Sequence, residues 1–310
     1  MTWLSIAIVA YLLYALAAAG DKALLAGSFK NPATYATFVG VGGLIPFIIL
    51  VIFIGVPLPS TAALFAAVVS GALFIVALLP YYRGIQEFEV SRIVPATGGL
   101  VPFFTLLIGL LFLPQEENLS LVAITSFTLL IAGSVLLSRD RERRISARSF
   151  RLALFASSLF ALSFVLLKYA YLLQPFWSGL LWVQVGSATM GLVFLATFRS
   201  VHEDVRRLFG GRKAEGGANR RTVGLFLATQ GTAAAAAILQ HAAFFLASAT
   251  YFAFVNALQG TQYLFLFILA LALSSRYPHL FHEERSQGTI AQKLIGIFLV
   301  ISGLVVLAFV

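Results

Sequence analysis

The chain has 310 residues, of which 60% are hydrophobic and only 11% are charged, and it contains no Cys. Soluble domains carry about 25% charged residues, so this composition excludes an ordinary water-soluble fold. The lack of Cys excludes disulfides, thiolate metal sites and cysteine nucleophiles. In such an apolar chain the net charge of +9 is interpreted as a signal of membrane orientation, and no nucleic-acid partner is expected.

Apolar blocks of about 20 residues recur along the whole chain, and a helix of that length crosses the hydrocarbon core of a bilayer. They predict an all-α integral membrane protein with ten transmembrane helices, most of them separated by short turns rich in Pro, Gly, Asn and Ser. The predicted helices cover residues 3–27, 32–54, 60–81, 91–113, 119–137, 150–172, 176–198, 222–246, 249–273 and 289–309.

Two connections are long and charged, at residues 139–151 and 199–221. The second contains two Gly-Gly pairs and is expected to be partly a solvated loop. Ten helices place both termini on one side of the membrane and every Lys and Arg except Lys168 near the other side. Because basic residues are retained in the cytoplasm, both termini are predicted to be non-cytoplasmic.

The second half of the chain echoes the first half in the same order. QEENLS and FTLLIAGSVLL correspond to HEERSQ and IFLVISGLVVL. Upstream, PYYRGIQ aligns with ILQHAAF and pairs Arg83 with His241, while DKALL aligns with LKYAYLL and pairs Lys22 with Lys168. Since each half has five helices, an odd number, the second half enters the membrane inverted.

The repeat predicts a first five-helix unit at 1–138, a basic cytoplasmic linker at 139–149 and a second five-helix unit at 150–310. Inverted repeats are typical of secondary transporters, whose substrate sites lie between the halves near the midplane of the membrane. A duplication could also serve only to build a stable bundle.

At residues 89–137, EVSRIVPATGGLVPFFTLLIGLLFLPQEENLS is followed by LLIAGSVLL, and a weaker copy recurs in the second half. This pattern resembles the EamA-type members of the drug/metabolite transporter superfamily. The resemblance covers nearly the whole chain and implies a ten-helix transporter of small metabolites, which in the family include amino acids, sugars and drug-like molecules. The expected location is the cell membrane of a bacterium or an archaeon.

The fourth predicted helix contains Pro95, Gly98, Gly99 and Pro102 within eight residues. Each proline removes a backbone donor, so a break in this helix is predicted. Freed backbone groups are tolerated in membranes where they find other partners or line a cavity. The small residues could instead serve close helix packing.

The ninth predicted helix carries Asn256, Gln259 and Gln262 at spacings of three, beside Tyr263. This spacing places the amides on one helical face, which should avoid lipid and face a cavity or another polar helix. Such amides can also act only as hydrogen bonds between helices. Further candidates for substrate binding are Gln184, His241 and the paired Lys22 and Lys168, although lysines near helix ends can also extend to the headgroups.

Arg83, Glu87 and Arg92 lie around the turn between the third and fourth predicted helices. They are expected to form a solvated ion-pair cluster at the cytoplasmic mouth, with gating as an alternative. The chain has no P-loop, GxSxG or HExxH motif, so no catalytic residue, metal or cofactor is expected.

The function favoured by these patterns is secondary transport of a small polar or anionic metabolite by alternating access. Alternatives are a flippase for a lipid-linked sugar and, less favoured, a membrane-embedded enzyme acting on lipid phosphates. The expected partners are a small-molecule substrate and membrane lipid, with the chain acting as a monomer or homodimer.

The predicted orientation can be tested with a C-terminal reporter that is active only in the cytoplasm. The distribution of Lys and Arg predicts that the reporter stays silent. A matched fusion in the basic segment at 139–149 should be active. Strong activity at the C-terminus would contradict the predicted topology.

Overall fold

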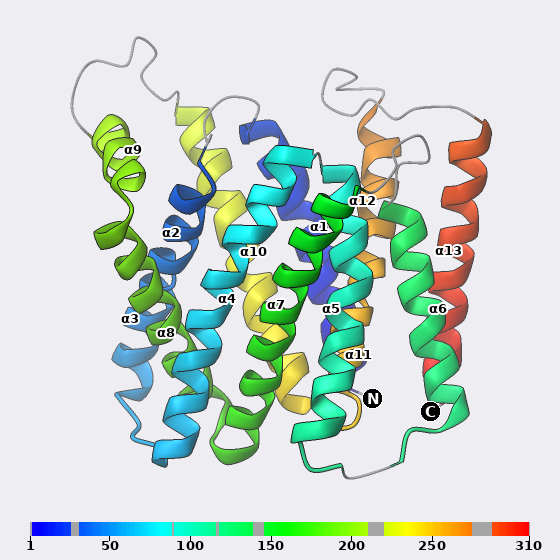
Figure 1. The fold of residues 1–310 in the computed structure, drawn as a ribbon, viewed down its shortest axis with the longest axis horizontal. Coiled ribbons are helices and arrows are strands. Elements are labelled where there is room, and N and C mark those ends of the chain that lie inside the picture. The colour runs from blue at the N-terminus through cyan, green and yellow to red at the C-terminus, as the bar shows by residue number, and fades with distance from the viewer. Residues whose placement is uncertain are drawn as a thin grey trace.

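The computed structural model describes residues 2–25, 31–88, 90–115, 118–138, 146–209, 220–274 and 287–309. All regular secondary structure in these ranges is helical, which confirms the expected all-α class (Figure 1). The helices are α1 (Thr2–Leu25), α2 (Pro32–Gly42), α3 (Leu44–Ile54), α4 (Thr61–Phe88), α5 (Val90–Phe112), α6 (Leu121–Ser138), α7 (Ala147–Leu173), α8 (Phe176–Thr197), α9 (Arg199–Phe209), α10 (Arg220–Leu246), α11 (Phe252–Ala257), α12 (Gln259–Ser274) and α13 (Gln287–Leu307).

Seven helical segments of the described chain are long and apolar enough to cross a membrane. They are Thr2–Ala19, Pro32–Phe53, Thr61–Phe88, Leu121–Ser138, Ala147–Leu173, Phe176–Thr197 and Phe252–Leu269. Large apolar side chains also point outward from the bundle, among them Phe53, Phe65, Phe112 and Phe298. Such extensive apolar surface is unfavourable in water, and with the long helices it indicates a membrane-embedded protein.

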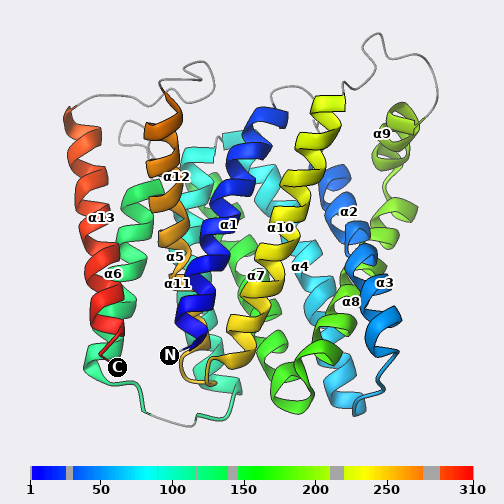
Figure 2. The same ribbon diagram turned by 180° about the vertical axis from the view of Figure 1, so that it is seen from behind.

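The bundle is elongated across its helices, which stand side by side (Figures 1 and 2). The pair α6 and α13 closes one end, α2, α3, α8 and α9 form the other, and the remaining helices lie between them. The most extensive packing is between α4 and α7, α1 and α10, and α6 and α13. Both chain termini lie at the same end of the bundle.

Local sequence accounts for several helix boundaries. Asn31 accepts a hydrogen bond from the Ala33 amide with Pro32 at the first helical position of α2, a favourable helix start. Ser146 and Ser149 form a reciprocal capping box at the start of α7. Gly43 separates α2 from α3, and Gly55 ends α3 with a φ of 71°, a conformation that glycine adopts without steric strain.

The core of the bundle depends on close approach of small residues. At Gly71 of α4 an added Cβ would collide with the Val183 carbonyl of α8, and at Gly186 of α8 it would collide with the Val68 carbonyl of α4. Ser70 and Ser163 donate to each other's carbonyl oxygens across α4 and α7, both at 2.9 Å. Small residues and serine hydroxyls are the usual means by which helices associate in lipid.

The prediction of a helix break at Pro95, Gly98, Gly99 and Pro102 is wrong, because α5 runs continuously from Val90 to Phe112. A proline removes one hydrogen bond, and the remaining bonds of a long helix can hold its course. The glycines serve packing instead. A Cβ on Gly98 would lie 3.4 Å from the Tyr263 hydroxyl oxygen, and one on Gly99 would lie 3.0 Å from Val135.

One further expectation needs correction. The ninth predicted helix is interrupted at one residue, Leu258, which separates α11 from α12. Leu258 stays in the right-handed helical region, with φ −67° and ψ −5°, and its amide still bonds to the Phe254 carbonyl.

The connection at 199–221 is expected to be only partly a loop, and its first part forms α9, which packs on α2. Val201 is fully buried there and the Thr34 hydroxyl donates to the Asp204 carboxylate at 2.7 Å.

Replacing Gly71 with Ala tests the close packing of α4 on α8. The new methyl group would meet the Val183 carbonyl and lie 2.8 Å from the Ser187 amide nitrogen, so backbone must move. We expect a loss of about 1–3 kcal/mol in the free energy of unfolding, seen as earlier thermal unfolding in detergent. The control is Gly231→Ala in α10, where nothing lies within 4 Å; equal effects of the two substitutions would contradict the packing described.

Candidate functional site

The interruption between α11 and α12 lies deep in the bundle, and every residue of α11 is buried. The Leu258 carbonyl accepts from both the amide and the hydroxyl of Thr261. The Val255 carbonyl accepts from the Tyr11 hydroxyl of α1 at 2.8 Å. Side chains therefore supply part of the hydrogen bonding at the interruption, as a membrane interior requires.

Tyr11 belongs to a chain of polar side chains that joins α1 to α10. Gln240 of α10 donates from its amide nitrogen to the Tyr11 hydroxyl at 3.2 Å. The Tyr14 hydroxyl in turn donates to the Gln240 amide oxygen at 3.1 Å. One continuous hydrogen-bonded path thus runs from Tyr14 through Gln240 and Tyr11 to the Val255 carbonyl of α11.

Asn256 directly follows Val255 in α11 and contacts α5. It is 4% exposed, and its amide nitrogen donates to the Thr105 hydroxyl at 3.2 Å. That hydroxyl donates onward to the Val101 carbonyl at 2.7 Å. The structure therefore places Asn256 in a hydrogen bond between helices, which agrees with the packing alternative for this residue.

Tyr263 has a buried hydroxyl that makes no hydrogen bond to the described part of the chain. It packs on Gly98 of α5, and Gln259 lies one turn earlier in the same helix. The side chains of Tyr11 and Tyr81 come close enough to Tyr263 to interact with it electrostatically. Helices α1, α4, α5 and α12 therefore converge on a hydroxyl that forms no hydrogen bond of good geometry, although the Gln259 side chain of its own helix lies close enough to interact with it. A buried polar group without a hydrogen bond is unfavourable.

Lys168 of α7 is 2% exposed and is the only Lys, Arg, Asp or Glu among the buried residues that the structure describes. Its ammonium group donates to the carbonyl oxygens of Phe244 and Phe245, both at 3.3 Å, and to that of Ala247. Those carbonyls lie at the C-terminus of α10. The side chain thus turns inward and does not extend to the headgroups.

His241 of α10 lies one turn before the Lys168 contacts. Its Nδ1 atom forms a hydrogen bond with the Tyr171 hydroxyl at 2.9 Å, and the two rings meet edge to face. Tyr171 follows Lys168 by three residues, so both side chains extend from one face of α7. His241 and Lys168 are therefore brought together, at the same helix interface.

Other predicted residues lie elsewhere. Gln184 packs on Gly43 between α2 and α3, where a Cβ on the glycine would lie 3.1 Å from its side-chain oxygen. Gln262 is half-buried in α12. The side chains of Lys22, Arg92 and Pro95 lie outside the described part of the structure.

The predicted ion pair between Arg83 and Glu87 is present, at 2.9 Å. Arg148, at the start of α7, also contacts the Glu87 carboxylate at 2.9 Å and lies over the Phe88 ring. Both arginines are about two-thirds exposed, so the cluster is solvated and contributes little to stability. It joins α4 to α7 at the end of the bundle opposite the termini.

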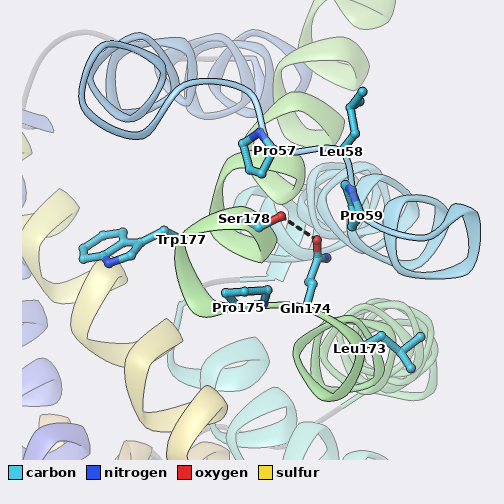
Figure 3. Close-up of a pocket in the computed structure, with 8 residues that line it drawn as sticks. All are labelled: Pro57, Leu58, Pro59, Leu173, Gln174, Pro175, Trp177 and Ser178. Atoms are coloured by element: carbon cyan, nitrogen blue, oxygen red, sulfur yellow. Dashed lines mark hydrogen bonds between the residues drawn. The ribbon is translucent and has the colours of Figure 1, made fainter.

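A pocket of about 300 Å³ lies at the end of the bundle that carries the termini. Figure 3 shows that it is formed by Pro57, Leu58 and Pro59 facing the turn between α7 and α8. Its buried polar side chains are already paired, because Ser178 donates to Gln174 at 2.8 Å and Gln174 donates to the Ala63 carbonyl. None of the polar groups around the interruption lines it, so it is separate from the candidate site.

The sequence patterns missed Tyr11, Tyr14, Gln240 and Thr105. Tyr11 and Tyr14 lie three residues apart in the first helix, and this spacing could have placed them on one face. The pairing of Gln240 with Tyr11 connects residues 229 apart in the chain and has no local signature. Within the described residues, no cluster of three or more His, Asp or Glu side chains could hold a metal ion.

No family model matches the chain, and no curated protein matches it. Its fold does recur among solved structures. One of them, described only as "Crystal structure of protein", is similar over 99% of this chain and 96% of its own length, with a TM-score of 0.60 and 16% identity. At that identity the likeness concerns the fold alone, which extends over nearly the whole of both chains.

Proposed function

We propose that the chain is a secondary transporter of small polar metabolites that works by alternating access. In this proposal ten helices cross the membrane, with α2 and α3 acting as one crossing and α11 and α12 as another. The crossings form two inverted five-helix repeats of the EamA type. The termini are placed on the non-cytoplasmic side, in keeping with the distribution of Lys and Arg.

The packing of the helices supports the repeat. Under the proposed alignment α1 is equivalent to α7, α4 to α10, and α5 to the α11–α12 pair. The contact of α1 with α10 then matches that of α7 with α4, and the contact of α1 with α12 matches that of α7 with α5. The alignment also makes α6 equivalent to α13, and α2 to α8. Each of these two contacting pairs therefore joins equivalent helices of the two halves.

The observation that carries the transport proposal is the interrupted helix between the halves. Two residues of the first half bind to adjacent residues of α11 just before the interruption, Tyr11 at the Val255 carbonyl and Thr105 at Asn256. Discontinuous helices at the interface of inverted repeats are a recurring form of substrate site in transporters. Gln259 directly follows Leu258, and the buried hydroxyl of Tyr263 lies one turn further along, where both could bind a substrate in another conformation.

The side chains at this place favour a particular kind of substrate. Tyrosine hydroxyls and amides form hydrogen bonds without carrying a full charge. The buried Lys168 ammonium is directed at three carbonyl oxygens. We therefore propose an uncharged or zwitterionic substrate that forms hydrogen bonds, rather than an anion held by Lys168.

Uptake into liposomes tests the proposal. Purified protein is reconstituted and offered a panel of radiolabelled neutral and zwitterionic metabolites together with a lipid-linked sugar. We expect time-dependent accumulation of at least one small metabolite. Movement of the lipid-linked sugar alone would indicate a flippase, and chemical change of a lipid without uptake would indicate an enzyme; either result would contradict metabolite transport.

The variant Tyr263→Phe separates binding from folding. Because the Tyr263 hydroxyl has no partner in the described structure, its removal should leave the thermal unfolding temperature unchanged or slightly higher. Uptake should nevertheless fall about tenfold, the effect of losing one buried hydrogen bond of about 1.4 kcal/mol. The control is Ile268→Ala, an exposed position of the same helix, which should transport normally. Normal uptake by Tyr263→Phe would contradict its place in the site.

A further inference from the structure

We propose that Lys168 is a tethered cation: its ammonium group occupies a carbonyl site at the C-terminus of α10 that would otherwise require a free cation. The Lys168 ammonium has three protons, and three carbonyl oxygens accept from it, those of Phe244, Phe245 and Ala247. Lys168 is in this respect a part of the fold rather than a ligand for an anion.

The end of α10 explains why a cation is needed at this place. A helix leaves its last four carbonyl groups without partners inside the helix, and these groups carry a partial negative charge. Here the Ala247 amide bonds to the Ala243 carbonyl, which leaves the carbonyls that follow. Phe244 and Ala247 are each only 1% exposed, so water has little access to replace the lysine.

The carbonyl site lies at the turn that connects α10 to α11. After Ala247 the chain turns, and the Ser248 carbonyl accepts from the amides of Tyr251 and Phe252 at the start of α11. Phe164, one turn before Lys168 in α7, stacks on Phe244 with ring centroids 5.1 Å apart. The lysine therefore holds the C-terminus of α10 against α7, immediately before the turn into α11.

In ion-coupled transporters, carbonyl groups at helix ends and unwound segments coordinate the coupling cation. In this chain a covalently attached ammonium fills a site of that kind. A corollary, which rests on the proposed transport function, is that uptake does not depend on sodium. The assignment of the carbonyl site itself does not rest on transport and can be tested by stability alone.

The test compares Lys168→Ala with Lys168→Met in detergent, with choline chloride as the only salt. Both variants should unfold at least about 5 °C below the wild type, because they leave buried carbonyl groups without a cation. In Lys168→Ala the deleted atoms match n-propylammonium, so millimolar n-propylammonium should restore at least half of the loss. The uncharged 1-propanol should not restore it, and neither compound should rescue Lys168→Met, whose side chain fills the space.

The control variant is Lys293→Ala, which removes a lysine that lies over the Phe267 ring in another part of the bundle. It should not respond to n-propylammonium. The proposal is overturned if Lys168→Met is as stable as the wild type, or if n-propylammonium fails to stabilise a folded Lys168→Ala. Should both variants fail to fold, the wild type still decides: replacing choline by sodium should change neither its unfolding temperature nor its uptake, and a stabilisation by sodium would show that the cation site is not filled by Lys168.

Discussion

The requirement that every polar backbone group find a partner without water governs this structure. A continuous helix meets that requirement by itself, whereas an interrupted helix or a buried helix end must be completed by side chains. At the interruption between α11 and α12, the Tyr11 hydroxyl donates a hydrogen bond to the Val255 carbonyl. At the C-terminus of α10, the Lys168 ammonium donates hydrogen bonds to three carbonyl oxygens. The two most elaborate polar contacts of the interior therefore lie on either side of the turn that leads from α10 into α11.

The rest of the bundle is built to hold these irregular segments in place. Glycine and serine allow α4 to approach α7 and α8 closely, as at Gly71 and in the Ser70–Ser163 pair. The same use of small residues brings α6 and α13 together at Gly133, where a Cβ would lie 2.9 Å from the Gly296 carbonyl. Closely packed interfaces resist small deformations, so a change of conformation is expected to move groups of helices as units. The interruption between α11 and α12 is the place where such groups of helices could contact a substrate.

Much of the fold could be predicted from the sequence because hydrophobic blocks and turn residues are local signals. Helices occur at each of the ten predicted ranges, and the structure brings Lys168 and His241 to one interface. The location of the helix break could not be predicted in the same way. Pro95 and Pro102 suggested a break that α5 does not have, whereas α11 and α12 separate at Leu258 without a proline or glycine at that position. That interruption depends on partners from distant segments, such as Tyr11 and Thr105, which no local pattern reveals.

Alternating access requires that the interruption between α11 and α12 becomes accessible from each side of the membrane in turn. Since the chain has no Cys, a single Gln259→Cys substitution gives a unique reporter beside the interruption. Sealed vesicles of both orientations are treated with a small, membrane-impermeant thiol reagent, and labelling is measured by mass spectrometry. We expect the thiol to be labelled from both faces. Protection from both faces, or labelling from one face only, would contradict alternating access.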